Sequence, residues 1–145
     1  MALRALFDKP RRTPAQCLLA KAKREAGEED FSRRFELQIR AHRLPEPTRE
    51  LRFASAEGRG WRFDFAWEPY RVAVELEGLV AVRMRDGSVF AGGRHATFEG
   101  FRRDTEKYAV AAILGWYVLR FEQQMVKAGE AIALTERMLK SKGWR

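Results

Sequence analysis

The sequence predicts an α/β fold in which a mixed central sheet is flanked by helices. Two observations lead to this prediction. The hydrophobic pattern changes along the chain in the order helix, helix, three strands, helix, strand, helix. The last strand follows a helix, and a helical crossover returns a strand parallel to its neighbour. With 145 residues the chain is long enough for one domain and too short for two ordinary ones.

The first predicted helix begins at a capping box after a short basic stretch, residues 1–12. Thr13 stands at the cap position, Pro14 at the first helical position and Gln16 three residues after the cap. We expect this helix to end at about Gly27.

A second helix is predicted over residues 31–43, capped by Asp30. Phe31, Phe35 and Ile39 recur at helical spacing and form its apolar stripe. Glu36 lies on the flank of that stripe, and two prolines shortly after residue 43 end the helix.

Three strands are then predicted, and the last two form a hairpin. Pro69 and Tyr70 are the expected turn centre, which pairs residues whose numbers sum to 139 and places Asp64 opposite Glu75. Since strand side chains alternate, the aromatic positions of the first hairpin strand share one face, while Glu75 and Glu77 share the other. The predicted strands span residues 48–54, 61–67 and 71–76.

Residues 81–100 read as a long loop or as a hairpin around Asp86-Gly87. Helical periodicity returns over residues 101–114 and ends at Gly115; a strand over residues 117–121 and a helix over residues 128–141 follow. The inward side chains of the helix before Gly115 are expected to be Phe101, Tyr108, Ala109 and Ala112.

The three carboxylates of the hairpin are the main functional signal. Two carboxylates facing each other across an antiparallel pair repel, and at a half-buried site one of them has its pKa raised. A divalent cation such as Mg²⁺ or Mn²⁺ removes this repulsion, because it takes oxygen ligands. The alternative is that Asp64 and Glu75 point to solvent, each near an arginine. With Glu77 as a third acid, the pattern favours a metal site.

The charge of the chain points to nucleic acid. Lys and Arg together number 28 against 20 Asp and Glu, a net charge of +8, and most of the cations are arginine. The guanidinium fork suits phosphate oxygens, although an arginine-rich proteome would give a similar composition. Cys17 is the single cysteine, which excludes an intrachain disulfide and a cysteine-based zinc site. No apolar run approaches a membrane span, so we expect an intracellular soluble protein.

Six motifs in order resemble the PD-(D/E)XK nuclease superfamily, and most closely its small phage or prophage endonuclease domains related to very-short-patch repair endonucleases. The likeness runs from about residue 31 to residue 125. The motifs are Glu36; Asp64-Phe65; Glu75-Leu76-Glu77-Gly78; His95 in a glycine-rich loop; Asp104-Thr105-Glu106-Lys107; and Gly115-Trp116-Tyr117-Val118-Leu119-Arg120-Phe121.

The resemblance implies a restriction-endonuclease-like αβββαβ core over residues 31–145, after a basic extension with one helix over residues 1–30. It implies a Mg²⁺-dependent DNA endonuclease in the cytoplasm of a bacterial host, linked to repair or recombination. Asp64 and Glu75 would bind the metal, with Glu77 as a ligand or base and Glu36 as a further ligand. His95 would act in acid–base chemistry or contact phosphate. Arginines at four positions would hold the DNA backbone: Arg94, Arg102, Arg103 and Arg120.

One position departs from the superfamily pattern. Glu77 stands where the pattern has lysine, and Lys107 on the following helix is the candidate replacement. Arg103, Asp104 and Lys107 would share one helix face directed at the site, or form an ordinary solvated face.

Two alternatives stay open: a non-catalytic DNA-binding relative, and a junction resolvase that acts as a homodimer. Glu36 could instead only pair with Arg40. Trp61, Trp67 and Trp116 are expected in the core rather than as base-stacking surfaces.

Overall fold

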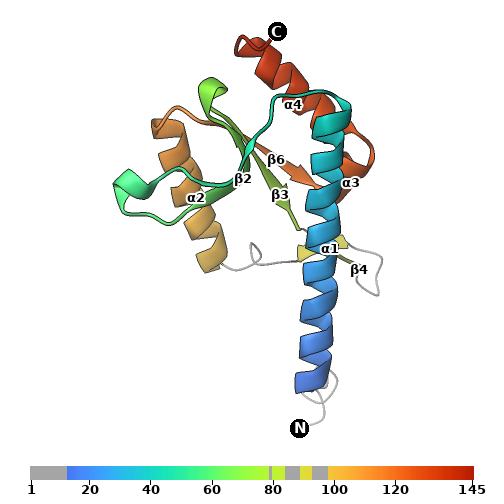
Figure 1. The fold of residues 1–145 in the computed structure, drawn as a ribbon. Helices are drawn as coiled ribbons and strands as arrows, with labels where there is room; N and C mark the ends of the chain where they lie inside the picture. The colour runs from blue at the N-terminus through green and yellow to red at the C-terminus, as the bar shows by residue number, and fades with distance from the viewer. Residues whose placement is uncertain (1–12, 79, 84–88, 93–97) are drawn as a thin grey trace. The chain divides into compact units, whose positions relative to one another are not determined.

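A computed structural model describes residues 13–78, 80–83, 89–92 and 98–145 of the chain. Contacts divide the chain into two compact units, Met1–Asp30 and Phe31–Arg145. The second unit contains an α/β fold with a four-stranded mixed sheet and helices on both sides (Figure 1). The general class predicted from the sequence is therefore confirmed.

The first helix, α1, runs from Pro14 to Ala41 without a break. The capping box is present: the Gln16 amide donates to Thr13 Oγ1 at 3.3 Å, and the Thr13 amide donates to Gln16 Oε1 at 2.9 Å. The predicted division into two helices is wrong, since Gly27 and Asp30 both lie inside α1. A glycine inside a helix costs only about 1 kcal/mol relative to alanine, and the neighbouring residues are mostly good helix formers.

The main sheet has the strand order β1-β2-β3-β6. Its strands are β1 (Thr48–Arg52), β2 (Arg62–Trp67), β3 (Val72–Glu77) and β6 (Tyr117–Glu122). The first two neighbouring pairs are antiparallel, and β6 is parallel to β3, as the crossover predicts. Two short 3₁₀ turns lie between the strands: η1 (Ser55–Glu57) and η2 (Glu68–Tyr70).

The predicted hairpin register is confirmed at three positions of β2 and β3. Trp67 pairs with Val72, Ala66 with Ala73 and Phe65 with Val74, and each pair sums to 139 as expected. Beyond these pairs, Asp64 takes a different partner: its Oδ2 accepts a hydrogen bond of 2.7 Å from the Leu76 amide. The ladder therefore gives way to a side-chain contact at the candidate site.

A second hairpin follows β3. β4 (Val80–Arg83) pairs antiparallel with β5 (Val89–Gly92) in a two-stranded sheet, so residues 81–100 contain the hairpin that was one of the two expectations. Its Asp86-Gly87 centre lies outside the described residues.

Helix α2 spans Phe98–Ile113 and ends at Gly115, whose φ of 80° is left-handed. The predicted inward face is largely wrong. Ala111 is fully buried, whereas Phe101 is 66% exposed. The inward residues follow the helical spacing Asp104, Lys107, Tyr108 and Ala111, so the helix turns a mostly polar stripe toward the sheet.

Two helices end the chain where one was predicted. α3 (Gln123–Lys127) begins directly after β6, capped by Glu122, which accepts from the Gln124 and Met125 amides. α4 spans Glu130–Ser141. Gly129, with a φ of 78°, separates them. The carboxylate cap satisfies amides that would otherwise lack partners, and so allows the extra turn.

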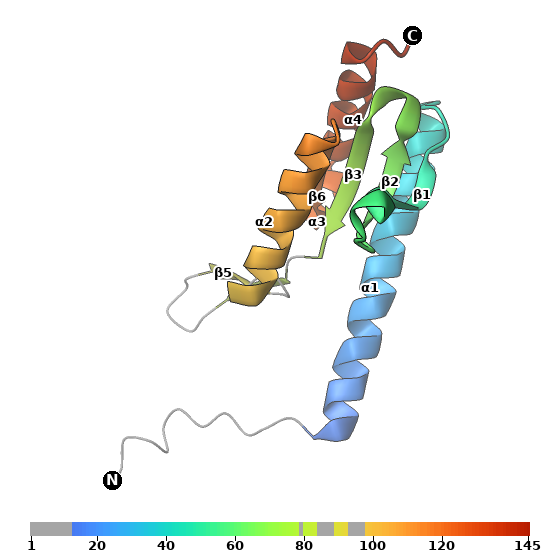
Figure 2. The same cartoon turned by 90° about the vertical axis from the view of Figure 1, so that its left-hand side faces the viewer.

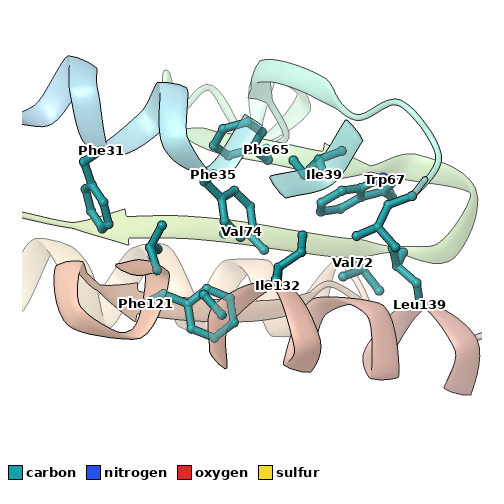
Figure 3. Close-up of a cluster of buried hydrophobic side chains, with 13 residues drawn as sticks. Phe31, Phe35, Ile39, Phe65, Trp67, Val72, Val74, Phe121, Ile132 and Leu139 are labelled. Atoms are coloured by element: carbon teal, nitrogen blue, oxygen red, sulfur yellow. The ribbon is translucent and has the colours of Figure 1, made fainter. Parts of the chain in front are cut away.

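Two hydrophobic clusters cover opposite faces of the sheet. The larger one joins the predicted stripe of α1 (Phe31, Phe35 and Ile39) to α4 and to one face of the strands (Figure 3). The smaller one lies under α2, which is on the other side of the sheet from α4 (Figure 2).

Strand β2 contributes aromatic side chains to both clusters. Phe65 and Trp67 belong to the larger cluster and Phe63 to the smaller one. The prediction of a single aromatic face is therefore wrong. The alternation shifts at Asp64, next to the point where Glu50 of β1 adopts a left-handed φ of 50° and no β1–β2 pair forms. This local distortion turns Phe63 to the α2 side.

Candidate active site

A pocket of about 700 Å³ lies over the end of β3, against the first turns of α2. Four of the residues predicted for catalysis meet there: Asp64, Glu75, Glu77 and Lys107. Arg103 and Asp104 also line it, so the predicted helix face is directed at the site. The remaining lining residues are Trp61, Leu76, Glu99 and Gly100.

Asp64 is fixed by the backbone of β3 and is largely buried. Burial raises the pKa of the Asp64 carboxyl from 3.8 to about 6; the hydrogen bond from the Leu76 amide opposes this rise, and the negative charge of Glu75 adds to it. The two acids are therefore close enough to repel each other, as the hairpin register predicts.

Glu75 is held at both oxygens by α2. Lys107 Nζ contacts Oε1, and the Tyr108 hydroxyl donates to Oε2 at 2.6 Å. The Lys107 and Glu75 side chains are 15% and 12% exposed, so this ion pair is shielded from water. Shielding strengthens the attraction and also makes the loss of one partner costly.

Tyr108 was not among the predicted site residues. Burial, followed by the charge of Glu75, raises the pKa of the Tyr108 phenol, so the hydroxyl stays protonated and acts as a donor. Its oxygen also lies 3.5 Å from Glu77 Oε1. The sequence assigned Tyr108 to the apolar core face; its place four residues after Asp104 and beside Lys107 is the signal that could have identified it.

Glu77 is 7% exposed and is bound by an arginine of the neighbouring strand. Arg120 Nε donates to Glu77 Oε1 at 2.6 Å, and its guanidinium lies 3.6 Å from Asp104 and 4.3 Å from the centre of the Tyr108 ring. Arg120, predicted to hold DNA, therefore contacts the acids of the site.

Asp64 and Glu75 are the two acids of the pocket predicted to hold a cation. Among the residues that the structure describes, no group of three or more His, Cys, Asp or Glu side chains converges in a way that could hold a metal. Mg²⁺ is commonly bound by one or two carboxylates, with water and substrate phosphate completing its shell. Asp64 and Glu75 are the candidates for that role; both oxygens of Glu75 are bonded to Lys107 and Tyr108, and Glu77 is bound to Arg120.

Glu36 lies apart from this pocket. It is bonded to Arg40 at 3.1 Å, four residues along α1, and pairs with Arg49 of β1 at 3.4 Å. The pair with Arg40 was the expected alternative. Glu36 lines a different pocket, beside Ile39 and Leu44. The structure therefore does not bring Glu36 together with Asp64 and Glu75, as a further metal ligand would require.

The other predicted DNA contacts are divided. Arg103 lines the pocket and pairs with Glu99 at 3.1 Å. Arg102 is exposed and does not line it. Arg94 and His95 lie outside the described residues.

We compared the chain with protein-family models, curated proteins and solved structures, and none of them matched it. Across the described residues, no helix combines the length and the apolar character needed to cross a membrane.

Proposed function

We propose that the chain is a metal-dependent DNA endonuclease with a restriction-endonuclease-like core. The order of α1, the three strands β1 to β3, α2 and β6 agrees with the αβββαβ core of that superfamily, with the β4–β5 hairpin inserted before α2. Fold alone does not define activity, so the proposal depends on the side chains of the pocket.

The observation that carries the proposal is the meeting of Asp64, Glu75 and Lys107 in one pocket, from β2, β3 and α2. Lys107 contacts Glu75, and so brings a cation to the acidic pair although Glu77 occupies the lysine position of the superfamily pattern. Two carboxylates can bind Mg²⁺, and a lysine ammonium can contact a phosphate oxygen, so these groups are suited to metal-assisted hydrolysis of a phosphodiester.

Each residue has a distinct role in this proposal. Asp64 and Glu75 would hold Mg²⁺ or Mn²⁺, which when bound activates water and stabilises charge on the phosphate. Lys107 orients Glu75 and offers its ammonium to a phosphate oxygen. Tyr108 holds the second oxygen of Glu75. In the net reaction, the oxygen of water bonds to phosphorus as one phosphorus–oxygen ester bond breaks, and the leaving sugar oxygen takes up a proton to become a hydroxyl.

The test is cleavage of plasmid, single-stranded, flapped and branched DNA with Mg²⁺ or Mn²⁺. Asp64→Asn, Glu75→Gln and Lys107→Met should each lower the rate by about a hundredfold or more. Glu136→Gln is a matched control, since Glu136 is another ion-paired glutamate but lies outside the pocket, bonded to Lys140. Full cleavage by the folded Glu75→Gln variant would overturn the proposal.

A non-catalytic DNA-binding protein is the second candidate, and one observation favours it. Lys107 and Tyr108 already occupy both oxygens of Glu75, and Arg120 binds Glu77. A site neutralised in this way has less need of a metal. Calorimetry with Mn²⁺ and DNA separates the two: tight DNA binding without Mn²⁺ binding supports this candidate, and Mn²⁺ binding lost in Asp64→Asn supports the nuclease.

A further inference from the structure

The three tryptophans that were expected in the core do not share one environment. Trp67 and Trp116 are 2% and 6% exposed, so the prediction is confirmed for them. Trp61 is only half-buried and lines the pocket that holds Asp64 and Glu75. Its position in the connection between β1 and β2 places an indole at the wall of the candidate active site.

Trp61 belongs to a ladder of planar groups that leads outward from the core. The fully buried Phe63 stacks on Phe53, with ring centres 3.9 Å apart and an angle of 6° between the planes. Phe53 in turn lies 6.5 Å from Trp61 at 21°. The Arg59 guanidinium follows, 5.1 Å from the centre of the Trp61 ring.

The outer end of the ladder is fixed to α2. Arg59, whose side chain is 50% exposed, pairs with Glu106. The inner end lies near the acidic pair, because Lys107 Nζ is 5.8 Å from the Phe63 ring and contacts Glu75. The planar groups are therefore held beside the site from both ends.

A purely structural ladder would explain the packing of Phe53 on Phe63. It does not explain why Trp61, with the Arg59 guanidinium against its ring, lines a pocket of about 700 Å³, a volume in the range of small-molecule sites. Tryptophan and arginine are among the side chains on which nucleic-acid bases stack, through aromatic π faces and through cation–π attraction.

We propose that Trp61 and Arg59 form a stacking platform for an unpaired nucleobase next to the phosphate bound at Asp64 and Glu75. The platform rests on the proposed function and specifies its substrate class: DNA with an unpaired nucleotide at the site, such as a single strand, a bulge or a flap. In an intact duplex the faces of each base are covered by its neighbours, so the platform has nothing to bind unless a base leaves the stack, which costs a few kcal/mol.

The experiment measures binding without cleavage, using fluorescence anisotropy of a labelled single-stranded oligonucleotide and of its duplex in EDTA. Trp61→Leu should weaken single-strand binding about tenfold or more and duplex binding less than twofold. Trp61→Phe, which keeps an aromatic face, should restore most of the lost affinity. Tyr117→Leu is the matched control, since Tyr117 is an exposed aromatic residue outside the pocket.

The Trp61→Leu variant must first show a native circular-dichroism spectrum. The proposal is then overturned if its affinity falls equally for single-stranded and duplex DNA, or falls for neither. The outcome is separable from that of the nuclease. A chain that cleaves no DNA but binds single strands through Trp61 refutes the nuclease and keeps the platform. A nuclease whose single-strand affinity is unaffected by Trp61→Leu refutes the platform alone.

Discussion

At Asp64 a side chain takes over the role of a backbone partner in the sheet. The last recorded pair between β2 and β3 is Phe65 with Val74, and the Leu76 amide then donates to Asp64 Oδ2. A buried amide needs an acceptor, so the fold itself holds this carboxylate at the pocket. Burial also disfavours the negative charge of Asp64. The folded protein therefore keeps this candidate metal ligand in place at a cost in the free energy of unfolding.

Asp64→Asn should stabilise the metal-free protein at neutral pH. The pKa of Asp64 in the folded chain, about 6, lies above its ordinary value of 3.8, so the folded state binds the proton more tightly. The free energy of unfolding therefore falls as the pH rises from about 4 to about 6, and the loss persists above that window. Each pKa unit corresponds to about 1.4 kcal/mol. Because solvent partly screens the site, we expect Asp64→Asn to raise the free energy of unfolding by about 1–2 kcal/mol at pH 7.

Urea unfolding in EDTA at neutral pH and below pH 4 checks this prediction. The stabilisation by Asp64→Asn should disappear in acid, because Asp64 of the wild-type chain is then protonated in both the folded and the unfolded state. Glu46→Gln, a change at an exposed carboxylate outside the site, is the control. A gain of the same size at both pH values would show that the ionisation of Asp64 is not its cause.

Tyr108→Phe should impair the site with little change in fold. The variant removes the hydroxyl that donates to Glu75 Oε2 and keeps the ring beside Arg120. A hydrogen bond to a charged group contributes about 1.5–3 kcal/mol, so we expect roughly a tenfold or larger fall in kcat under the proposed function. Steady-state cleavage assays measure it, with Tyr117→Phe as the control. Unchanged kcat would remove Tyr108 from the positioning of Glu75.

At the scale of elements, α1 shows how a helix can pass through residues that usually end one. Gly27 keeps helical geometry, and a Cβ added there would have no neighbour within 4 Å. Gly115 is the contrasting case, since it ends α2 with a left-handed φ of 80°. The same residue type is therefore tolerated in one helix and required at the end of another.

Gly27→Ala should stabilise α1 by about 0.5–1 kcal/mol, because alanine loses less conformational freedom in a helix. Hydrogen exchange of the α1 amides on either side of Gly27 measures the change. Gly115→Ala is the matched comparison and should instead destabilise the whole fold by about 1–2 kcal/mol. Destabilisation of α1 by Gly27→Ala would indicate that the helix ends at Gly27, as the sequence predicted.

At the scale of the whole molecule, net charge and local charge differ. The chain carries +8, yet the candidate pocket contains several carboxylates, and Arg103 and Arg120 are paired with acids there. Under the proposed function, we therefore expect the positive charge that attracts DNA to lie outside the pocket more than within it. Arg102, exposed and outside the pocket lining, is placed for that role.

Two arginine variants test this division of charge. Arg102→Gln should reduce the slope of log affinity for duplex DNA against log salt concentration by about 0.9, the value for one phosphate contact. Arg120→Gln should leave the slope nearly unchanged and lower the free energy of unfolding by about 1–3 kcal/mol, because the largely buried Glu77 loses a positively charged partner. The reverse pattern would assign Arg120 to the DNA backbone.

The accuracy of the sequence predictions depended on how local each feature is. The capping box at Thr13 and the turn after Trp67 are set by adjacent residues, and both are present. The helix end predicted at Gly27 was wrong because the neighbouring residues continue the helix. The helix predicted over residues 128–141 corresponds to α4, but the short helix α3, which the Glu122 cap begins, was not predicted. At the site, the hairpin register placed Asp64 near Glu75, whereas Lys107 was suggested by the resemblance to the nuclease superfamily. Tyr108 and Trp61 were assigned to the core, since an aromatic side chain gives no local sign of the pocket it faces.

The sequence by itself determined the three strands, the helical crossover to a parallel strand, the apolar stripe of residues 31–39 and the register of the hairpin next to its turn, because these follow from periodicity and turn geometry. Only the tertiary structure decided which side chains the acids contact. Lys107 and Tyr108 reach Glu75 from α2, and Arg120 reaches Glu77 from β6. Those contacts join residues more than thirty positions apart, and their partners are selected by the packing of α2 and β6 against β3, which no local pattern encodes.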